Sequence, residues 1–191
     1  MVVIMYYYNI NKQNEIIINK EDVKYSKLKL INEFENFINI SGYELIGNID
    51  IKSSPYVVNI AKDNKIYKII MYYKNITGAG WYNKPNIRRV QVTNVRKADI
   101  NKYISTSNNS FFVIFGYYNF DDNPIMVAWN AYNFVYHETT RSCYVSTELL
   151  IQGYKKGFIK TNYSKQQIWI FTPNNFEFFL DDYIKCNKVN Y

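Results

Sequence analysis

One segment near the start of the chain, residues 26–42, repeats its apolar residues at helical spacing. When it is wound with the period of an α-helix, five apolar side chains fall on one face. They are Leu28, Ile31, Phe34, Phe37 and Ile38. Ser26 can cap the start by accepting a backbone N–H, and Gly42 can end the helix in a left-handed conformation. The pattern therefore predicts an amphipathic helix that packs on a sheet.

Most of the remaining chain alternates between short apolar runs and turn residues, a pattern typical of strands. The runs are rich in Val, Ile, Tyr and Phe, which favour extended backbone. The expected strands cover residues 2–8, 15–18, 43–51, 55–62, 65–76, 87–95, 110–118, 124–132, 158–162 and 167–172. The turn signal "DNK" predicts a tight hairpin between the fourth and fifth of these runs.

Three further segments, 98–105, 146–157 and 173–186, predict helices. In the second, Ser146 can cap the start and Gly157 can stop the helix. We therefore expect an α+β fold, with a mostly antiparallel mixed sheet or a partly open barrel and about four flanking helices. No Pro-, Gly- or Ser-rich linker divides the chain, so we expect a single domain over 1–191, with 1–104 and 105–191 as possible lobes.

The charge of the chain leaves two interpretations open. Its 191 residues include 23 Lys and Arg against 16 Asp and Glu, a formal net charge of +7. A basic surface attracts polyanions such as nucleic acid. The codons of an AT-rich genome, however, also favour Lys, Asn, Ile and the 20 Tyr found here. Charge alone therefore does not separate polyanion binding from compositional drift.

The cysteines and the apolar runs indicate where in the cell the protein is expected. Cys143 and Cys186 lie far apart, with no Cys-x-x-Cys pattern or ligand cluster, so no zinc site is expected. The apolar start lacks a basic leader and a cleavage site. No apolar run reaches the roughly 18 residues that a membrane span needs. We expect a cytoplasmic protein without a membrane partner.

The stretch from residue 74 to 92, "KNITGAGWYNKPNIRRVQV", combines glycines, aromatic residues and cations. The runs on either side predict the two strands of a hairpin, which would leave the residues between them at an exposed tip. Lys and Arg neutralise phosphates, aromatic rings stack on bases, and Arg or amide side chains read base edges. The candidate nucleic-acid contacts are Trp81, Tyr82, Lys84, Arg88, Arg89, Gln91, Arg96 and Lys97.

The two adjacent arginines of this stretch cannot act together. In a strand, neighbouring side chains point to opposite faces, so only one of Arg88 and Arg89 can join a single patch with Lys84. Gln91 shares the face of Arg89. An ordinary solvated hairpin with a packed Trp81 is the alternative to nucleic-acid binding.

A catalytic alternative depends on one short pattern. The signatures of ATP binding, dinucleotide binding and serine hydrolases are absent from the chain. Asp50 and Lys52 form an acid-x-Lys pair, and Glu44 lies upstream on the same expected strand and on the same face as Asp50. In metal-dependent nucleases such acids hold Mg²⁺ and such a lysine activates water. These three residues are also what the solvent face of a half-buried strand contains. Mg²⁺ is expected only if the protein is a nuclease, and no cofactor is expected for binding alone.

Several stretches together resemble a known kind of domain. They are "YKIIMYYKNITGAGWYNKPNIRRVQV", "FFVIFGYYNFDDNPIMVAWNAYNF", "SCYVSTELLIQGYKKG" and "IWIFTPNNFEFFL". Over about residues 55–181 the chain is similar to accessory or DNA-recognition domains of bacterial restriction endonucleases. Arg89 and Gln91 match the "RVQ" element of that pattern, and Trp129 matches its "AW" element. The resemblance implies recognition of DNA in defence against foreign DNA, but it supplies no catalytic residue.

The sequence therefore favours a DNA-binding protein of a restriction or defence type that reads double-stranded DNA through a basic aromatic hairpin. One alternative is a Mg²⁺-dependent type II restriction endonuclease that uses Glu44, Asp50 and Lys52. Another is a protein-interaction module whose charge is drift. DNA is the expected partner, with a homodimer or a separate nuclease as further possibilities.

Overall fold

The structure is a computed structural model that describes residues 7–10, 15–19, 22–81, 83–93, 95, 109–120, 122–134 and 140–187. Its strands are β1 (Tyr7–Ile10), β2 (Ile16–Asn19), β3 (Glu44–Ile46), β4 (Tyr56–Lys62), β5 (Lys65–Asn75), β6 (Thr77–Gly78), β7 (Ile87–Val92), β8 (Ser110–Phe120), β9 (Asn123–Asn130), β10 (Arg141–Ser146), β11 (Phe158–Tyr163) and β12 (Gln166–Phe171). Its α-helices are α1 (Lys27–Ile40), α3 (Thr147–Lys156) and α4 (Phe176–Asn187), and its 3-10 turns are η1 (Ala131–Phe134) and η2 (Pro173–Asn175).

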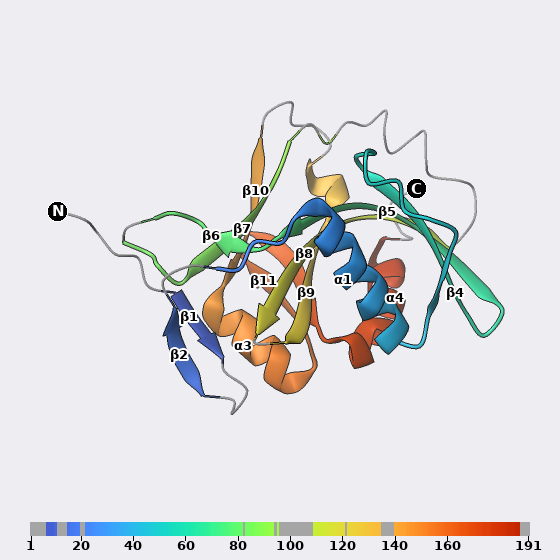
Figure 1. Cartoon of the computed structure of the whole chain (residues 1–191). Coiled ribbons are helices and arrows are strands. Elements are labelled where there is room, and N and C mark those ends of the chain that lie inside the picture. The colour runs from blue at the N-terminus through green and yellow to red at the C-terminus, as the bar shows by residue number, and fades with distance from the viewer. Residues whose placement is uncertain are drawn as a thin grey trace.

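A seven-stranded sheet forms the centre of the molecule, in the order β11-β12-β9-β8-β5-β4-β3. Neighbouring strands are antiparallel except for β5 and β8, which pair in parallel. A separate antiparallel sheet has the order β10-β7-β6, and β1 pairs with β2 beside α3. We call the β10-β7-β6 sheet the small sheet; in Figure 1 it lies on the opposite side of the molecule from α1 and α4.

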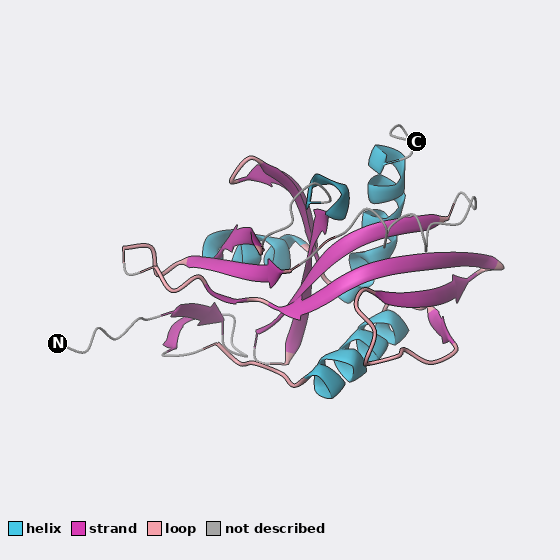
Figure 2. Cartoon of the chain, turned by 90° about the horizontal axis from the view of Figure 1, so that it is seen from above, coloured by secondary structure: helices cyan, strands magenta, loops and turns pink. Residues whose placement is uncertain are grey.

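The central sheet is covered on both faces because its middle strands are apolar on both faces. In β8, Phe115 belongs to one core and its neighbour Ile114 to the other. The first core receives α1 and α4, whose Phe34 and Phe179 rings lie 6.5 and 5.5 Å from the ring of Phe115. The second core receives β7, β10 and α3. Figure 2 shows the helices set around the long strands in the view from above.

A glycine in β8 lets the two sheets approach closely. A methyl group on Gly116 would lie 2.6 Å from Cγ1 of Ile76 and 2.8 Å from Cγ2 of Val90. Ile76 precedes β6, and Val90 is in the middle of β7. The missing side chain of Gly116 therefore sets how near the small sheet sits to the central one.

Several local predictions are confirmed. The hydroxyl of Ser26 caps α1 by accepting the backbone N–H of Lys29 at 3.3 Å. Ser146 caps α3 in the same way, and Gly157 ends that helix with a φ of 77°. The turn between β4 and β5 has positive φ at both Asp63 and Asn64, the conformation that closes a two-residue hairpin.

The expected fold class is wrong. The described residues are mostly β, and their large sheet is open rather than a partly open barrel. The described residues contain three α-helices instead of about four, and the helix expected over 98–105 lies outside the described residues. The balance shifts toward β because fewer helices form among the described residues than expected, while β5 and β8, rich in Ile, Tyr and Phe, each extend over 11 residues.

The helices also bear on the membrane question. Among the described residues, none of the helices combines the length and the apolar character needed to cross a bilayer. This agrees with the absence of a long apolar run in the sequence.

Candidate nucleic-acid interface

The candidate interface is built on a short hairpin of the small sheet. Its strands are β6 and β7, and Ala79 donates its N–H to the carbonyl of Ile87 at 2.9 Å. Within the loop, Lys84 donates to the carbonyl of Trp81 at 3.1 Å. Gly80 has a φ of 77°, a left-handed conformation that favours glycine, although a side chain there would meet no other atom. Backbone hydrogen bonds thus link described residues of the loop to one another and to β7.

The outgoing strand of this hairpin differs from the prediction. The sequence suggested that the run 65–76 pairs with 87–95. In the structure β5 pairs with β4 and β8 in the central sheet. The chain then passes into the small sheet at β6, which has only 2 residues. The sequence did not predict this change of sheet, because β5 and β6 follow each other closely and their residues form one strand-like pattern.

One face of the small sheet gathers aromatic and basic side chains. Across the strands, Arg89 lies directly opposite Thr77 of β6 and Tyr144 of β10, so these three side chains share a face. The ring of Trp81 reaches from the loop to within 5.0 Å of the Tyr144 ring, tilted by 34°. Trp81 is 38% exposed. We call Trp81, Lys84, Arg89, Gln91 and Tyr144 the aromatic–basic face.

The charges of this face point outward. The ammonium group of Lys84 lies 5.8 Å from the centre of the Trp81 ring, a cation–π arrangement. Gln91 is exposed and Arg89 is half-buried. As predicted, strand alternation places Arg89 and Gln91 together on one face. Within the part of the chain that the structure describes, neither Lys84 nor Arg89 forms an ion pair.

Arg88 does not belong to this face. Its side chain points to the interior and is 0% exposed. Its Nε and Nη2 atoms each lie 3.1 Å from Oδ1 of Asp22, and its guanidinium lies 5.0 Å from the centre of the Tyr118 ring. The assignment of Arg88 as a nucleic-acid contact is therefore corrected, since the side chain is sealed beneath the surface that Arg89 occupies.

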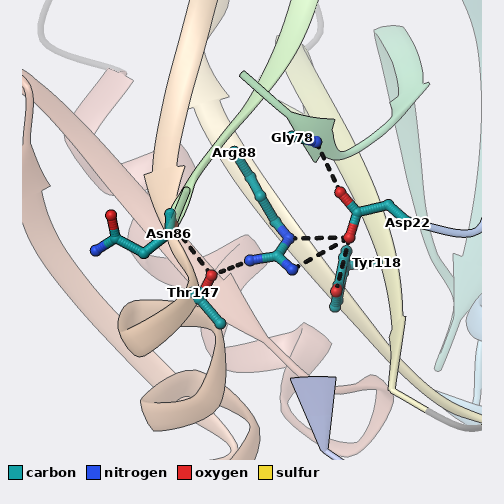
Figure 3. Close-up of polar contacts among 6 residues, drawn as sticks. All are labelled: Asp22, Gly78, Asn86, Arg88, Tyr118 and Thr147. Atoms are coloured by element: carbon teal, nitrogen blue, oxygen red, sulfur yellow. Dashed lines mark hydrogen bonds and ion pairs between the residues drawn. The ribbon is translucent and has the colours of Figure 1, made fainter. Parts of the chain in front are cut away.

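The same buried arginine ties the hairpin to the start of α3 (Figure 3). Arg88 donates through Nη1 to the hydroxyl of Thr147. Thr147 donates its hydroxyl and its backbone N–H to the carbonyl of Asn86, at 3.0 and 2.9 Å. The amide of Asn86 donates to Glu148 at 3.0 Å. Partial burial alone would raise the pKa of Glu148, but hydrogen bonds from Asn86, its own backbone and Ser146 leave that pKa below its usual value.

The remaining predicted contacts, Tyr82, Arg96 and Lys97, lie outside the described residues. Tyr144 and Asp22 were not predicted. Tyr144 could have been found from the alternation of "RSCYVS", which puts it on the same face of a strand as Ser142. Asp22 lies in a segment without periodicity, so no sequence signal indicates its partner.

The catalytic alternative does not assemble as expected. Glu44 and Asp50 were placed on one strand, but β3 ends at Ile46 and Asp50 lies in a turn. The carboxylate of Asp50 accepts the backbone N–H of Lys52 at 2.9 Å. This bond gives Asp50 a local structural role, and the side chain of Lys52 is exposed. Over the residues described here, no group of three or more His, Cys, Asp or Glu is arranged to hold a metal ion.

Cys143 is not placed to act as a nucleophile. Cys143 is fully buried, and burial raises the pKa of its thiol far above the usual value. A buried protonated thiol is a weak nucleophile. His137, the histidine of the chain, lies outside the described residues.

Comparison with known proteins gives one match. The model of a family described as methylase-associated X1 matches residues 67–180, a range that includes the whole hairpin, Tyr144 and strands β8, β9, β11 and β12 of the central sheet. This domain is linked to restriction–modification systems. Neither the comparison with curated proteins nor the comparison with solved structures found a match.

Proposed function

Because the chain belongs to the methylase-associated X1 family, we propose that it is a DNA-binding component of a restriction–modification system, and that it contacts DNA through the aromatic–basic face. The family match supports the restriction–modification context. The finer proposal, DNA binding at this face, comes from the geometry of the small sheet.

The observation that carries the proposal is the contrast between two adjacent arginines. Arg88 is neutralised inside the protein by Asp22, whereas Arg89 is on the outer face beside Tyr144. Trp81 and Lys84 extend this face along the hairpin loop. An outward cation beside exposed rings is the combination that neutralises a phosphate and stacks on a base. Gln91, in the next outward position, carries an amide that can read an adenine edge.

Magnitudes make the proposal testable. Each phosphate that a Lys or Arg neutralises adds about 0.9 to the slope of log affinity against log salt concentration. Stacking of a base on an aromatic side chain contributes roughly 1–3 kcal/mol. The face should therefore produce both a salt-dependent and a salt-independent part of the affinity.

The experiment compares two variants that lose the same charge. Lys84→Ala/Arg89→Ala removes two cations from the face, and Lys155→Ala/Lys156→Ala removes two exposed cations at the end of α3. Fluorescence anisotropy with a labelled DNA duplex is measured at several salt concentrations, after circular dichroism shows that both variants are folded. We expect the first variant to lose affinity on the order of tenfold or more and its salt slope to fall by about 2. Equal losses in the two variants would show that only overall charge matters.

The other functional hypotheses predict different results in the same assay. A protein-interaction module would show no salt-sensitive affinity for DNA at all. A Mg²⁺-dependent nuclease would shorten the labelled duplex when Mg²⁺ is added. Such a nuclease would need a metal site other than Glu44 and Asp50 on one strand, because β3 ends before Asp50.

A further inference from the structure

The carboxylate of Asp22 is held by donors from three separate elements (Figure 3). Its Oδ2 accepts the backbone N–H of Gly78 at 2.7 Å. Its Oδ1 accepts the hydroxyl of Tyr118 at 3.1 Å and lies 3.1 Å from both Nε and Nη2 of Arg88. The side chains of Asp22 and Arg88 are only 4% and 0% exposed.

These donors form a receptor for an oxyanion. A guanidinium, a backbone N–H and a phenol hydroxyl all converge on the same two oxygens, and none of these groups accepts a proton at neutral pH. Burial raises the pKa of Tyr118 well above its usual value, so its hydroxyl remains a donor. A buried cation of this kind favours a bound anion, because removing the carboxylate from a buried ion pair is costly.

The receptor and its occupant come from different parts of the chain. Gly78, Arg88 and Tyr118 all lie within the matched family region, residues 67–180, whereas Asp22 lies outside it. The family domain thus supplies every donor that the structure gives to this carboxylate, and the preceding segment supplies the anion.

The segment that carries Asp22 has a second, independent anchor. The backbone of Tyr25 exchanges two hydrogen bonds with the amide of Asn75, at 3.1 and 2.9 Å, and its hydroxyl accepts the amide of Asn119 at 2.8 Å. Between the two anchors, Val23 is 64% exposed. A small cavity beneath the segment is lined by Val23, Tyr25, Tyr117, Tyr118 and Asn119. The carboxylate of Asp22 can therefore be removed without releasing Tyr25 from the central sheet.

We propose that Gly78, Arg88 and Tyr118 form an oxyanion-binding site of the family domain, and that Asp22 of the N-terminal segment occupies this site in cis. The ligand class is a carboxylate or a phosphate oxyanion. Since Gly78 and Arg88 are in β6 and β7, occupancy of the site also holds the hairpin that carries Trp81. The proposal does not depend on DNA binding by the outer face.

The test uses the full chain with Asp22→Ala and measures the melting temperature in sodium acetate, sodium phosphate and sodium chloride at matched ionic strength. In chloride, we expect the variant to melt roughly 10 °C below the unsubstituted chain, because the buried guanidinium of Arg88 has lost the carboxylate of Asp22. Acetate or phosphate at about ten times its dissociation constant should restore roughly 3–6 °C, and chloride should restore none. The unsubstituted chain, with its site filled, should not respond beyond the chloride effect.

The control is Asp22→Ala/Arg88→Met, which removes both charges and so no longer needs an anion. We expect this double variant to show no specific response to acetate or phosphate. Rescue by acetate alone would identify a carboxylate site, and rescue by both anions a general oxyanion site; either result supports the proposal. Equal responses of the single and double variants, or equal effects of all three salts, would overturn it. If Asp22→Ala does not fold in chloride, refolding yield in the three salts replaces the melting temperature, and equal yields would refute the site.

Discussion

The same substitution should affect different properties at the two adjacent arginines, stability at Arg88 and DNA affinity at Arg89. Arg88→Met keeps most of the apolar stem but removes the guanidinium that bonds Asp22 through Nε and Nη2 and Thr147 through Nη1. The carboxylate of Asp22 then keeps the donors of Gly78 and Tyr118 but no cation. Arg89→Met removes a cation from the outer face, where the structure shows no buried partner among the described residues.

The burial of the pair sets the magnitude. With the two side chains 0% and 4% exposed, solvent screens little of the interaction, so the usual cost of breaking a buried ion pair applies, about 3–5 kcal/mol. Because Met refills the volume of the stem, the lower end of that range, about 3 kcal/mol, is expected. In a chain of this size that corresponds to a fall in melting temperature of roughly 6–12 °C. Arg89→Met should change stability by less than about 0.5 kcal/mol.

The assay is urea unfolding of both variants at pH 7, followed by circular dichroism, with DNA affinity measured on the same preparations. Arg88→Met should lose stability, and Arg89→Met should lose DNA affinity while remaining stable. Equal losses of stability in the two variants would refute the assignment of one arginine to the interior and the other to the surface.

Two further outcomes follow from the packing and the ionic contacts. Gly116→Ala should lower the free energy of unfolding in urea by about 1–3 kcal/mol, because the added methyl group overlaps Ile76 and Val90; a stability that is unchanged or higher would show that the two sheets can separate at no cost. For Asp182, burial alone would raise the pKa, but hydrogen bonds from Lys160 and Trp169 leave the pKa below its usual value. The ionised Asp182 therefore stabilises the fold above the unfolded pKa of about 4, and this stabilisation is lost as the pH falls through the lower folded pKa. Urea unfolding between pH 5 and pH 2.5 should therefore show a smaller loss for Asp182→Asn than for the unsubstituted chain, and parallel losses would contradict this.

The sequence predicted the elements whose signals are local. The helix over 26–42 and its Ser26 cap, the tight turn at Asp63 and Asn64, and the helix between Ser146 and Gly157 all depend on residues a few positions apart. The parallel pairing of β5 with β8 depends on residues separated by more than 40 positions, and no local pattern specifies it. For the same reason the sequence predicted one continuous strand where the chain passes from β5 in the central sheet to β6 in the small sheet.

The candidate site divides in the same way. Strand alternation was enough to separate Arg88 from Arg89 and to place Gln91 with Arg89. It was not enough to say which arginine faces inward, because that depends on Asp22 and Tyr118, which are distant in sequence. Glu44 and Asp50 were expected to share a strand face, but the glycine and asparagine after Ile46 end the strand early.

The most direct test of DNA binding at the aromatic–basic face is the response of the three tryptophans to DNA. Trp81 is 38% exposed on the face, whereas Trp129 and Trp169 are 0% and 1% exposed inside the two cores and serve as internal controls. In a chain labelled with ¹⁵N-tryptophan, titration with a short DNA duplex should shift or broaden the indole N–H signal of Trp81 and leave the other two unchanged. Saturable DNA binding with an unchanged Trp81 signal would contradict the proposed interface.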